Sequence, residues 1–265
     1  MKLAIRSFFL LLTLLLTACA NPGGGPDGGP YDETAPRVLA MSPKMGQTGL
    51  KNVKKITLHF SENIKIDNAQ EKVVVSPPQM EMPNIQVYGR TVTVELLDSL
   101  KPNTTYTIDF SDGIVDATEG NPLGHFTYYF STAETVDTLQ VSGKVLDAFT
   151  LEPSKNMLVG LYPAALNPDS LFCTQPFLRV SRTNEAGEFS IKGIAPGQYR
   201  IYALGDMDGD VKWSRGEALA FTNRLIEPTA FPDIRHDTVW ADTTRIDSIR
   251  ITPYTHFTPD AILLL

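Results

Sequence analysis

The chain has 265 residues, a formal net charge of −7 and only two cysteines. Its lysines and arginines form no run or stripe, which speaks against nucleic acid as a partner. Two cysteines in a chain of this length supply no disulfide framework, so the fold must depend on buried apolar side chains.

Residues 1–18 have the pattern of a secretory signal peptide. Lys2 and Arg6 precede the apolar run FFLLLTLLLTA at residues 8–18. That run is shorter than the roughly 20 residues of a membrane-spanning helix, but it suits the apolar part of a signal peptide. It ends in LTAC, which resembles the lipobox of bacterial lipoproteins. The resemblance implies cleavage before Cys19 and acylation of Cys19 with palmitate-type chains, whereas the alternative is an ordinary secretory signal that happens to contain a cysteine.

Residues 19–35 form a predicted tether. The segment after Cys19, ANPGGGPDGGPYDETA, consists largely of glycine and proline and has almost no apolar side chains. Such a composition cannot bury enough surface to order itself, and residues 20–35 would reach about 50 Å when extended. No aspartate follows Cys19, which favours the outer membrane over the inner one. We therefore expect a cell-envelope protein attached to the membrane through its N-terminal lipid.

Residues 36–133 show the two-residue alternation of half-buried strands. Turn sequences such as KPN and EGNP separate the strands, and this pattern predicts an antiparallel β-sandwich. The clearest alternating runs are KITLHF, TVTVEL, TYTIDF and FTYYF.

Several of these motifs resemble a known family. FSE at Phe60–Glu62, LKPNTTY at Leu100–Tyr106 and the turn from Asp116 to Asn121 occur in the order found in bacterial Ig-like domains of the S-layer-protein (SbsA) type. The resemblance implies that these residues shape strands and turns and are not catalytic.

Residues 134–223 contain a second alternating series. LQVSGKVL, MLVGLYP, GEFSIKGI and PGQYRIYAL read as strands and their turns. The GEF and PGQY elements are similar to those of carboxypeptidase-regulatory or transthyretin-like domains, which implies a structural or binding module. The predicted fold is thus all-β, with two tandem antiparallel β-sandwiches, the Ig-like one first, in a chain similar to envelope proteins of Bacteroidota.

Residues 224–265 carry a weaker signal. Short strands are expected at Thr238–Trp240 and Ile246–Ile251, and the chain ends in the apolar run AILLL. An exposed apolar edge invites aggregation. Either this run is buried in a sheet, or the chain is a truncated form of a longer protein, and we favour the second alternative.

The run GDMDGDVKWSRGE contains a candidate calcium loop. Hard oxygen ligands at positions 1, 3, 5, 7, 9 and 12 are the ligand pattern of an EF-hand. The candidate ligands are Asp206, Asp208, Asp210, Lys212 through its carbonyl, Ser214 and Glu217. The pattern departs from an EF-hand at position 6, where Val211 replaces the usual glycine. Its predicted flanks are strands, and the loop resembles calcium loops in the B domains of serine-aspartate repeat adhesins. The alternative is an acidic hairpin turn without a metal.

Little else in the sequence suggests chemistry. The four histidines have no ligand spacing, and nucleophile-elbow and phosphate-binding motifs are absent. We therefore predict a non-catalytic, lipid-anchored envelope protein whose domains act as a binding surface or spacer for an envelope protein or glycan, with calcium as its candidate cofactor. One alternative is a carbohydrate- or peptide-binding lipoprotein that uses Tyr129, Trp213 and Trp240. Another is a hydrolase with a carboxylate pair such as Asp109 and Asp112.

Overall fold

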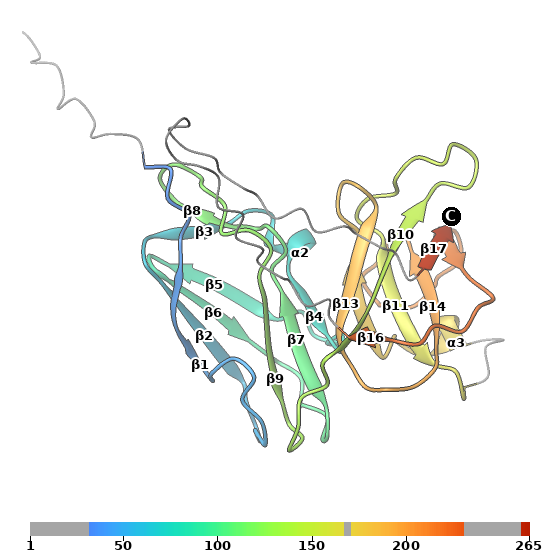
Figure 1. The fold of residues 1–265 in the computed structure, drawn as a ribbon, viewed down its shortest axis with the longest axis horizontal. Coiled ribbons are helices and arrows are strands. Elements are labelled where there is room, and N and C mark those ends of the chain that lie inside the picture. The colour runs from blue at the N-terminus through green and yellow to red at the C-terminus, as the bar shows by residue number, and fades with distance from the viewer. Residues whose placement is uncertain (1–31, 167–170, 231–260) are drawn as a thin grey trace, which may run out of the picture. The chain divides into compact units, whose positions relative to one another are not determined.

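The computed structural model describes residues 32–166, 171–230 and 261–265. The predicted lipidation site Cys19 and the strands predicted between residues 238 and 251 lie outside these ranges. Thr34–Leu265 form one compact unit, and the fold is nearly all β, as predicted (Figure 1). No helix among the described residues is long and apolar enough to cross a membrane.

The N-terminal part of the described chain is built from antiparallel sheets. A four-stranded sheet has the order β1-β2-β6-β5, a three-stranded sheet has the order β4-β7-β9, and β3 pairs with β8. The strands are β1 (Val38–Ser42), β2 (Lys55–Phe60), β3 (Ile64–Ile66), β4 (Val74–Ser76), β5 (Asn84–Tyr88), β6 (Thr91–Glu95), β7 (Thr105–Asp109), β8 (Ile114–Asp116) and β9 (Thr127–Ser131), with the short helix α2 (Ala69–Lys72) between β3 and β4.

Alternation along these strands creates the first core. In β2, Ile56, Leu58 and Phe60 are buried, whereas His59 between them is exposed. Aromatic side chains from the other sheet fill the same core, and the rings of Tyr106 and Phe130 stack with centroids 5.4 Å apart. The predicted sandwich pattern is confirmed here, since alternate residues of one strand face the core.

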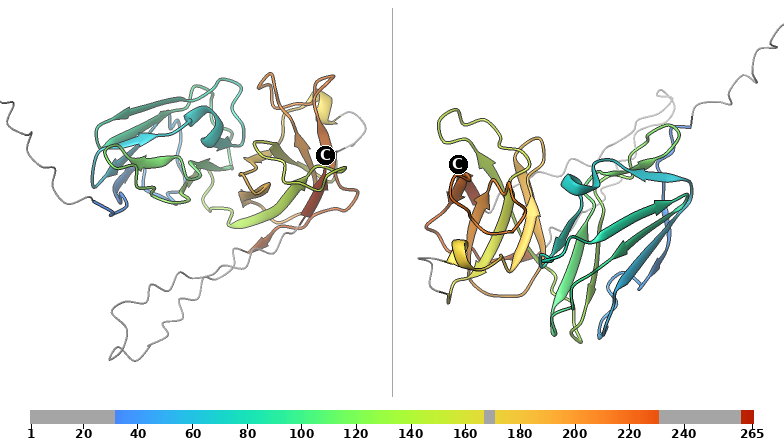
Figure 2. Two further views of the ribbon diagram at one scale, coloured as in Figure 1. Left: turned by 90° about the horizontal axis from the view of Figure 1, so that it is seen from above. Right: turned by 180° about the vertical axis from the view of Figure 1, so that it is seen from behind.

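The C-terminal part forms an eight-stranded sheet system. Its order is β12-β11-β14-β15-β17-β10-β13, with β16 pairing to β10. Figures 1 and 2 draw this part of the chain in colours from yellow-green to red. The strands are β10 (Leu139–Leu146), β11 (Leu158–Pro163), β12 (Arg179–Arg182), β13 (Glu188–Ile194), β14 (Tyr199–Leu204), β15 (Leu219–Phe221), β16 (Thr229–Ala230) and β17 (Ala261–Leu264), with the short helix α3 (Leu171–Thr174) between β11 and β12.

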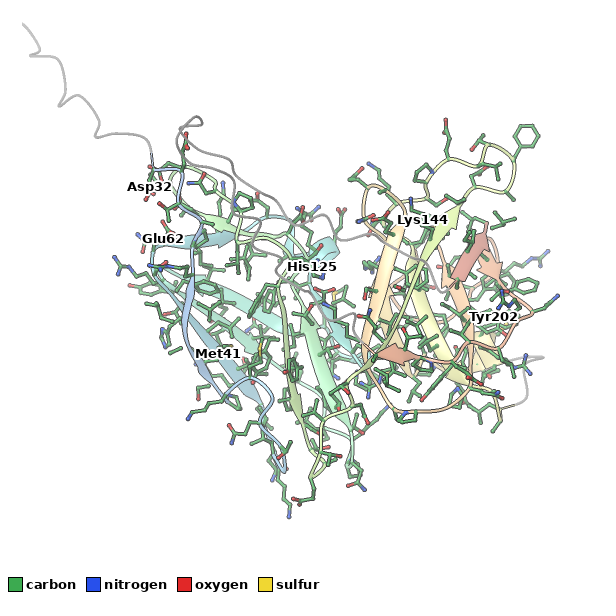
Figure 3. The ribbon with its side chains drawn as sticks, in the orientation of Figure 1. Asp32, Met41, Glu62, His125, Lys144 and Tyr202 are labelled. Atoms are coloured by element: carbon green, nitrogen blue, oxygen red, sulfur yellow. The ribbon has the colours of Figure 1, made fainter. Side chains whose placement is uncertain are left out.

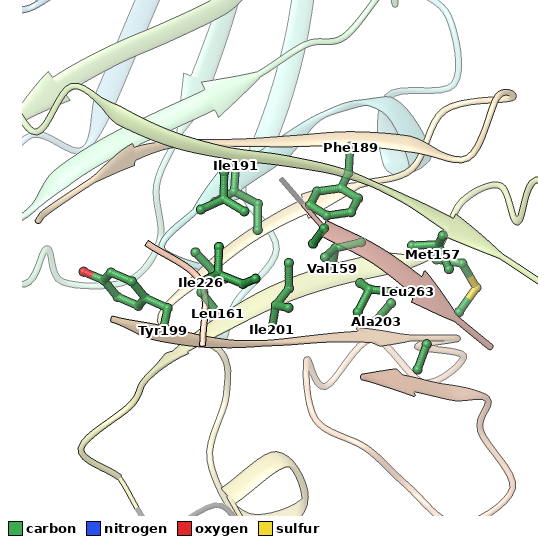
Figure 4. Close-up of a cluster of buried hydrophobic side chains, with 14 of the residues drawn as sticks. Met157, Val159, Leu161, Phe189, Ile191, Tyr199, Ile201, Ala203, Ile226 and Leu263 are labelled. Atoms are coloured by element: carbon green, nitrogen blue, oxygen red, sulfur yellow. The ribbon is translucent and has the colours of Figure 1, made fainter. Parts of the chain in front are cut away.

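Two clusters of buried side chains lie in this part. The larger one, drawn in Figure 4, collects alternate residues of β10, β11, β13, β14 and β17 around Val159, Phe189 and Ile201. A second cluster on the other face of β11 and β14 contains Tyr162 and Tyr202. Both faces of β11 and β14 are therefore buried, as their near-continuous apolar sequences suggest.

The strand β17 differs from the antiparallel prediction. It pairs in parallel with β10, from Gly143↔Ala261 to Leu146↔Leu264, and antiparallel with β15. Leu263 is fully buried in the core, and a Cβ atom on Gly143 would lie 2.4 Å from the carbonyl oxygen of Ala261. The apolar run at residues 261–265 is thus part of a sheet, and glycine at position 143 allows it to approach.

Candidate metal centre

The predicted calcium loop connects β14 to β15. The ladder between these strands ends at Leu204↔Leu219, and the amide of Gly205 then donates to the carbonyl of Ala218 at 2.9 Å. Residues 206–217 therefore connect two strands that are hydrogen-bonded to each other up to the start of the loop. This pairing fixes both ends of the loop. This is the β-hairpin setting that the sequence predicted.

The three aspartates meet within the loop. One carboxylate oxygen from each of Asp206, Asp208 and Asp210 lies within 4.8 Å of the others. Each carboxylate also accepts a backbone amide two or three residues further on: Asp206 from Gly209 at 3.1 Å, Asp208 from Asp210 at 3.2 Å, and Asp210 from Lys212 at 2.8 Å. These local hydrogen bonds curve the backbone so that alternate side chains converge.

Glu217 closes the loop from its far end. Its Oε1 accepts the amide of Met207 at 2.8 Å, and its Oε2 accepts the amide of Ser214 at 2.8 Å. The hydroxyl of Ser214 donates to Oδ2 of Asp208 at 3.3 Å. Each carboxylate oxygen has two lone pairs, so these amide bonds leave acceptor capacity on Glu217. Among the described residues, however, the carboxylates whose oxygens lie within 4.8 Å of one another are those of the three aspartates, and Glu217 is not one of them.

Val211 occupies the position at which the sequence departed from an EF-hand. Its φ is +62°, the left-handed conformation that glycine normally supplies. The sharp turn therefore forms, contrary to what a valine there suggested, at a cost of about 1–2 kcal/mol. The side chain of Val211 packs against the cluster that contains Tyr162 and Tyr202, and this burial offsets part of the strain.

Trp213 anchors the loop to the rest of the fold. Its Nε1 donates to the carbonyl of Glu217 at 2.9 Å, and its amide donates to the carbonyl of Phe172 at 2.7 Å. The rings of Phe172 and Trp213 meet edge to face with centroids 5.9 Å apart. These contacts explain Trp213 as a packing residue. Of the other aromatic residues considered for ligand stacking, Tyr129 packs beside Gly46 and Trp240 lies outside the described residues.

The electrostatics of the loop favour a cation. Between residues 206 and 217 four carboxylates face only two basic side chains, Lys212 and Arg215. Burial raises the pKa of Asp206, and the nearby charge of Glu217 raises it further, whereas Arg182 opposes this rise in pKa. Arg182, which the sequence did not indicate, comes from the distant strand β12. A divalent cation would relieve the repulsion that remains.

The other acidic candidates have local partners. Asp112 forms an ion pair with Lys72 at 2.9 Å, and this hydrogen bond lowers the pKa of Asp112. Asp109 accepts the amide of Ser111 at 3.0 Å and lies 3.4 Å from His125, which is labelled in Figure 3. A general acid of a glycosidase needs a raised pKa, so Asp112 does not suit that role.

The comparison with known families bears on the N-terminal part. Residues 32–132 match the family model described as the bacterial Ig-like domain. The Ig-like resemblance predicted from the sequence motifs is thereby confirmed. The transthyretin-like resemblance of residues 134–223 stays a prediction. No curated protein matches the chain in sequence.

Solved structures give low-scoring similarities. They include the N-terminal part of the bacterial S-layer protein SbsC, with a TM-score of 0.27 and 15% identity, covering 70% of this chain and 43% of that one. An L,D-transpeptidase from Mycobacterium smegmatis has a TM-score of 0.25 and 12% identity over 49% of this chain and 56% of that one. The T6 backbone pilin of Streptococcus pyogenes has a TM-score of 0.23 and 9% identity over 72% and 51%. The chain spans about half the length of these structures, and scores of this size support no conclusion about function.

Proposed function

We propose that the chain is a non-catalytic cell-envelope protein, anchored by lipid at Cys19, whose β domains act as a spacer or binding surface. The bacterial Ig-like match over residues 32–132 supports a module of this kind. The LTAC sequence and the glycine- and proline-rich segment behind it support the anchor and the tether. Two or more acyl chains on one residue give stable attachment where a single chain does not.

The role proposed for calcium is to stiffen the hairpin between β14 and β15. The convergence of the three aspartate carboxylates within 4.8 Å is the observation that carries it. Their carboxylates, the carbonyl of Lys212, the hydroxyl of Ser214 and the carboxylate of Glu217 would be the ligands. These are the hard oxygens that calcium prefers, and their number fits its usual coordination of six to eight. No nucleophile or base accompanies them, so the proposed role is structural.

Titration calorimetry of the full chain with calcium tests the metal proposal. Saturable binding of one ion is expected, together with its loss in Asp208→Asn, because Asp208 is the exposed member of the three. Asp67→Asn is a matched control, since Asp67 is an exposed aspartate of the Ig-like part. The absence of binding in the unaltered chain would leave only an acidic turn.

Metabolic labelling with a palmitate analogue tests the anchor. The unaltered chain should take up the label and partition with membranes, whereas Cys19→Ser should do neither. The variant Cys173→Ser serves as the control, because Cys173 is an exposed thiol in the folded part. Labelling that persists in Cys19→Ser would contradict the lipobox interpretation.

A further inference from the structure

A cleft of about 570 Å³ lies within the compact unit Thr34–Leu265. One side of it is formed by α2 and the end of β7, and the other by residues around β12 and at the start of β13. Its volume falls within the roughly 300–1,000 Å³ that is usual for small-molecule sites. None of the proposed calcium ligands lines the cleft, so it is a separate feature of the fold.

Buried hydrogen bonds hold the two sides of the cleft together. The amide of Val180 in β12 donates to Oγ of Ser76 in β4 at 3.1 Å, and both residues are buried. The guanidinium of Arg179, which is 5% exposed, donates to the carbonyl of Thr105 in β7. The walls of the cleft are therefore in place before a ligand arrives, which lowers the entropy cost of binding.

The lining of the cleft is almost entirely polar. Among the described residues its apolar members are Val74 and Phe189, and Phe189 is only 3% exposed because it belongs to the core of the C-terminal part. A peptide ligand needs pockets for its side chains, and this lining offers few. Hydroxyl and amide side chains, which can both donate and accept hydrogen bonds as sugar hydroxyls do, take their place. They are Ser111, Asn156, Ser181, Thr183, Asn184 and Ser190.

The carboxylates of the lining have partners. Four of them lie 2.9–3.4 Å from a basic side chain, in the pairs Asp112 with Lys72, Asp109 with His125, Glu185 with Lys155, and Glu188 with Lys144. The fifth, Glu71, accepts a hydrogen bond from the side-chain amide of Asn68. These interactions offset most of the negative charge in the lining.

Arg182 is the basic side chain of the cleft that lacks such a partner. Its Nη1 donates to the backbone and side-chain oxygens of Asn156, both at 3.3 Å. Among the described residues, no carboxylate forms an ion pair with it. Burial lowers the pKa of Arg182, and the charges of Asp206 and Glu71 oppose this fall. A guanidinium that is partly removed from water and has unused N–H groups is suited to bind a carboxylate through two hydrogen bonds.

We propose that the cleft binds a saccharide that carries a carboxylate group. The carboxylate pairs with the guanidinium of Arg182, and the sugar hydroxyls bond to the hydroxyl and amide side chains around it. This inference rests on the binding role proposed above and names the class of ligand. One unpaired guanidinium balances one negative charge, whereas a phosphate group with nearly two charges would leave an excess beside the acids of the lining.

Calorimetric titration of the full chain carrying Cys19→Ser, which removes the proposed lipid site, tests the proposal. Glucuronate should bind saturably with a Kd below about 1 mM, and glucose, its neutral counterpart, at least about tenfold more weakly. Arg182→Gln should abolish the preference for glucuronate. Arg224→Gln is the control, because Arg224 is an exposed arginine of the C-terminal part outside the cleft.

Asn156→Asp provides a second test that does not depend on removing the arginine. It keeps the size of the side chain and the φ of +56°, which aspartate tolerates almost as asparagine does. It also gives Arg182 a carboxylate partner within the chain. Glucuronate affinity should therefore fall at least about tenfold, while the melting temperature stays close to that of the unaltered chain.

Absence of glucuronate binding at about 10 mM would overturn the proposal. Equal affinities for glucuronate and glucose, or an unchanged glucuronate affinity in Asn156→Asp, would overturn it as well. Tighter binding of inorganic phosphate or of an acidic dipeptide than of glucuronate would contradict a saccharide as the ligand. Palmitate labelling at Cys19 is independent of all these outcomes, so failure here would leave the anchored spacer proposed above intact.

Discussion

The Glu217 carboxylate accepts the backbone amide of Met207, ten residues earlier in the chain, at 2.8 Å. Through its other oxygen it accepts the amide of Ser214. One side chain thus holds both arms of the loop that contains the three aspartates. The last position of the predicted calcium pattern is therefore part of the hairpin structure even without an ion.

Replacing this carboxylate should affect both the loop and its affinity for calcium. Glu217→Gln leaves only one acceptor oxygen, so one of the two amides loses its partner. Because the Met207 amide lies at the surface, where water can replace the partner, the cost should be about 0.5–1.5 kcal/mol. Calcium affinity should fall at least about tenfold, which corresponds to 1.4 kcal/mol. Chemical unfolding in chelator and calorimetric titration measure the two effects. Glu185→Gln is the control, because Glu185 is exposed and forms a surface ion pair with Lys155. Equal calcium affinity in Glu217→Gln and the unaltered chain would remove Glu217 from the ligand set.

Val211 offers a test of the strained turn. Glycine normally destabilises a protein relative to alanine by about 0.5–1 kcal/mol, but at a φ of +62° this order should reverse. Val211→Ala loses packing and keeps the strain, whereas Val211→Gly loses packing and relieves the strain. Thermal unfolding in chelator should therefore rank the glycine variant above the alanine variant. The opposite ranking would contradict the left-handed conformation.

Asp206 should make stability depend on pH. Burial, followed by the nearby Glu217, raises its pKa above the ordinary 3.8 in the folded protein. A carboxyl group with a raised pKa favours folding when protonated, and that contribution disappears as the pH rises through the folded pKa. Asp206→Asn imitates the protonated form at every pH.

In chelator, the unfolding free energy of the variant relative to the unaltered chain should therefore increase as the pH rises above 3.8, the ordinary pKa of an aspartate. Calcium affinity of the unaltered chain should fall over the same range as the pH is lowered, because the ion competes with the proton. A constant difference in unfolding free energy would show that the environment of Asp206 does not disfavour its charge.

Gly160 in β11 tests the packing of the second sheet system. A Cβ atom there would lie 2.0 Å from Cγ of Phe177, a buried ring. Gly160→Ala should destabilise the chain by about 1–3 kcal/mol or more, because the ring has little room to move. In the control Gly205→Ala, the nearest side-chain atom is at 3.4 Å, an ordinary contact. Equal melting temperatures of the two variants would contradict this packing.

The sequence was informative wherever structure follows local periodicity. Alternation alone placed Ile56, Leu58 and Phe60 of β2 in a core, because a strand turns successive side chains to opposite faces. Aspartates at every second position likewise predicted convergence in a tightly curved loop. Both features depend on residues close together in the chain.

Contacts between residues that are far apart in the sequence were not predicted. The parallel pairing of β17 with β10 joins residues more than a hundred positions apart, and no local pattern encodes it. The same is true of Arg182, which approaches Asp206 from another strand. In the EF-hand pattern a glycine usually occupies the left-handed position, so the sequence alone made Val211 a mismatch. The packing of Val211 against the cluster that contains Tyr162 and Tyr202 depends on contacts that the sequence does not show.

The most direct test of calcium stiffening is thermal unfolding of the full chain in millimolar calcium and in chelator. Binding to the folded state alone should stabilise it by about 2.7 kcal/mol when the free calcium concentration is one hundred times the Kd. The melting temperature should therefore rise with calcium, and Asp208→Asn should lose the rise. An unchanged melting temperature of the unaltered chain at millimolar calcium would contradict the proposed metal centre.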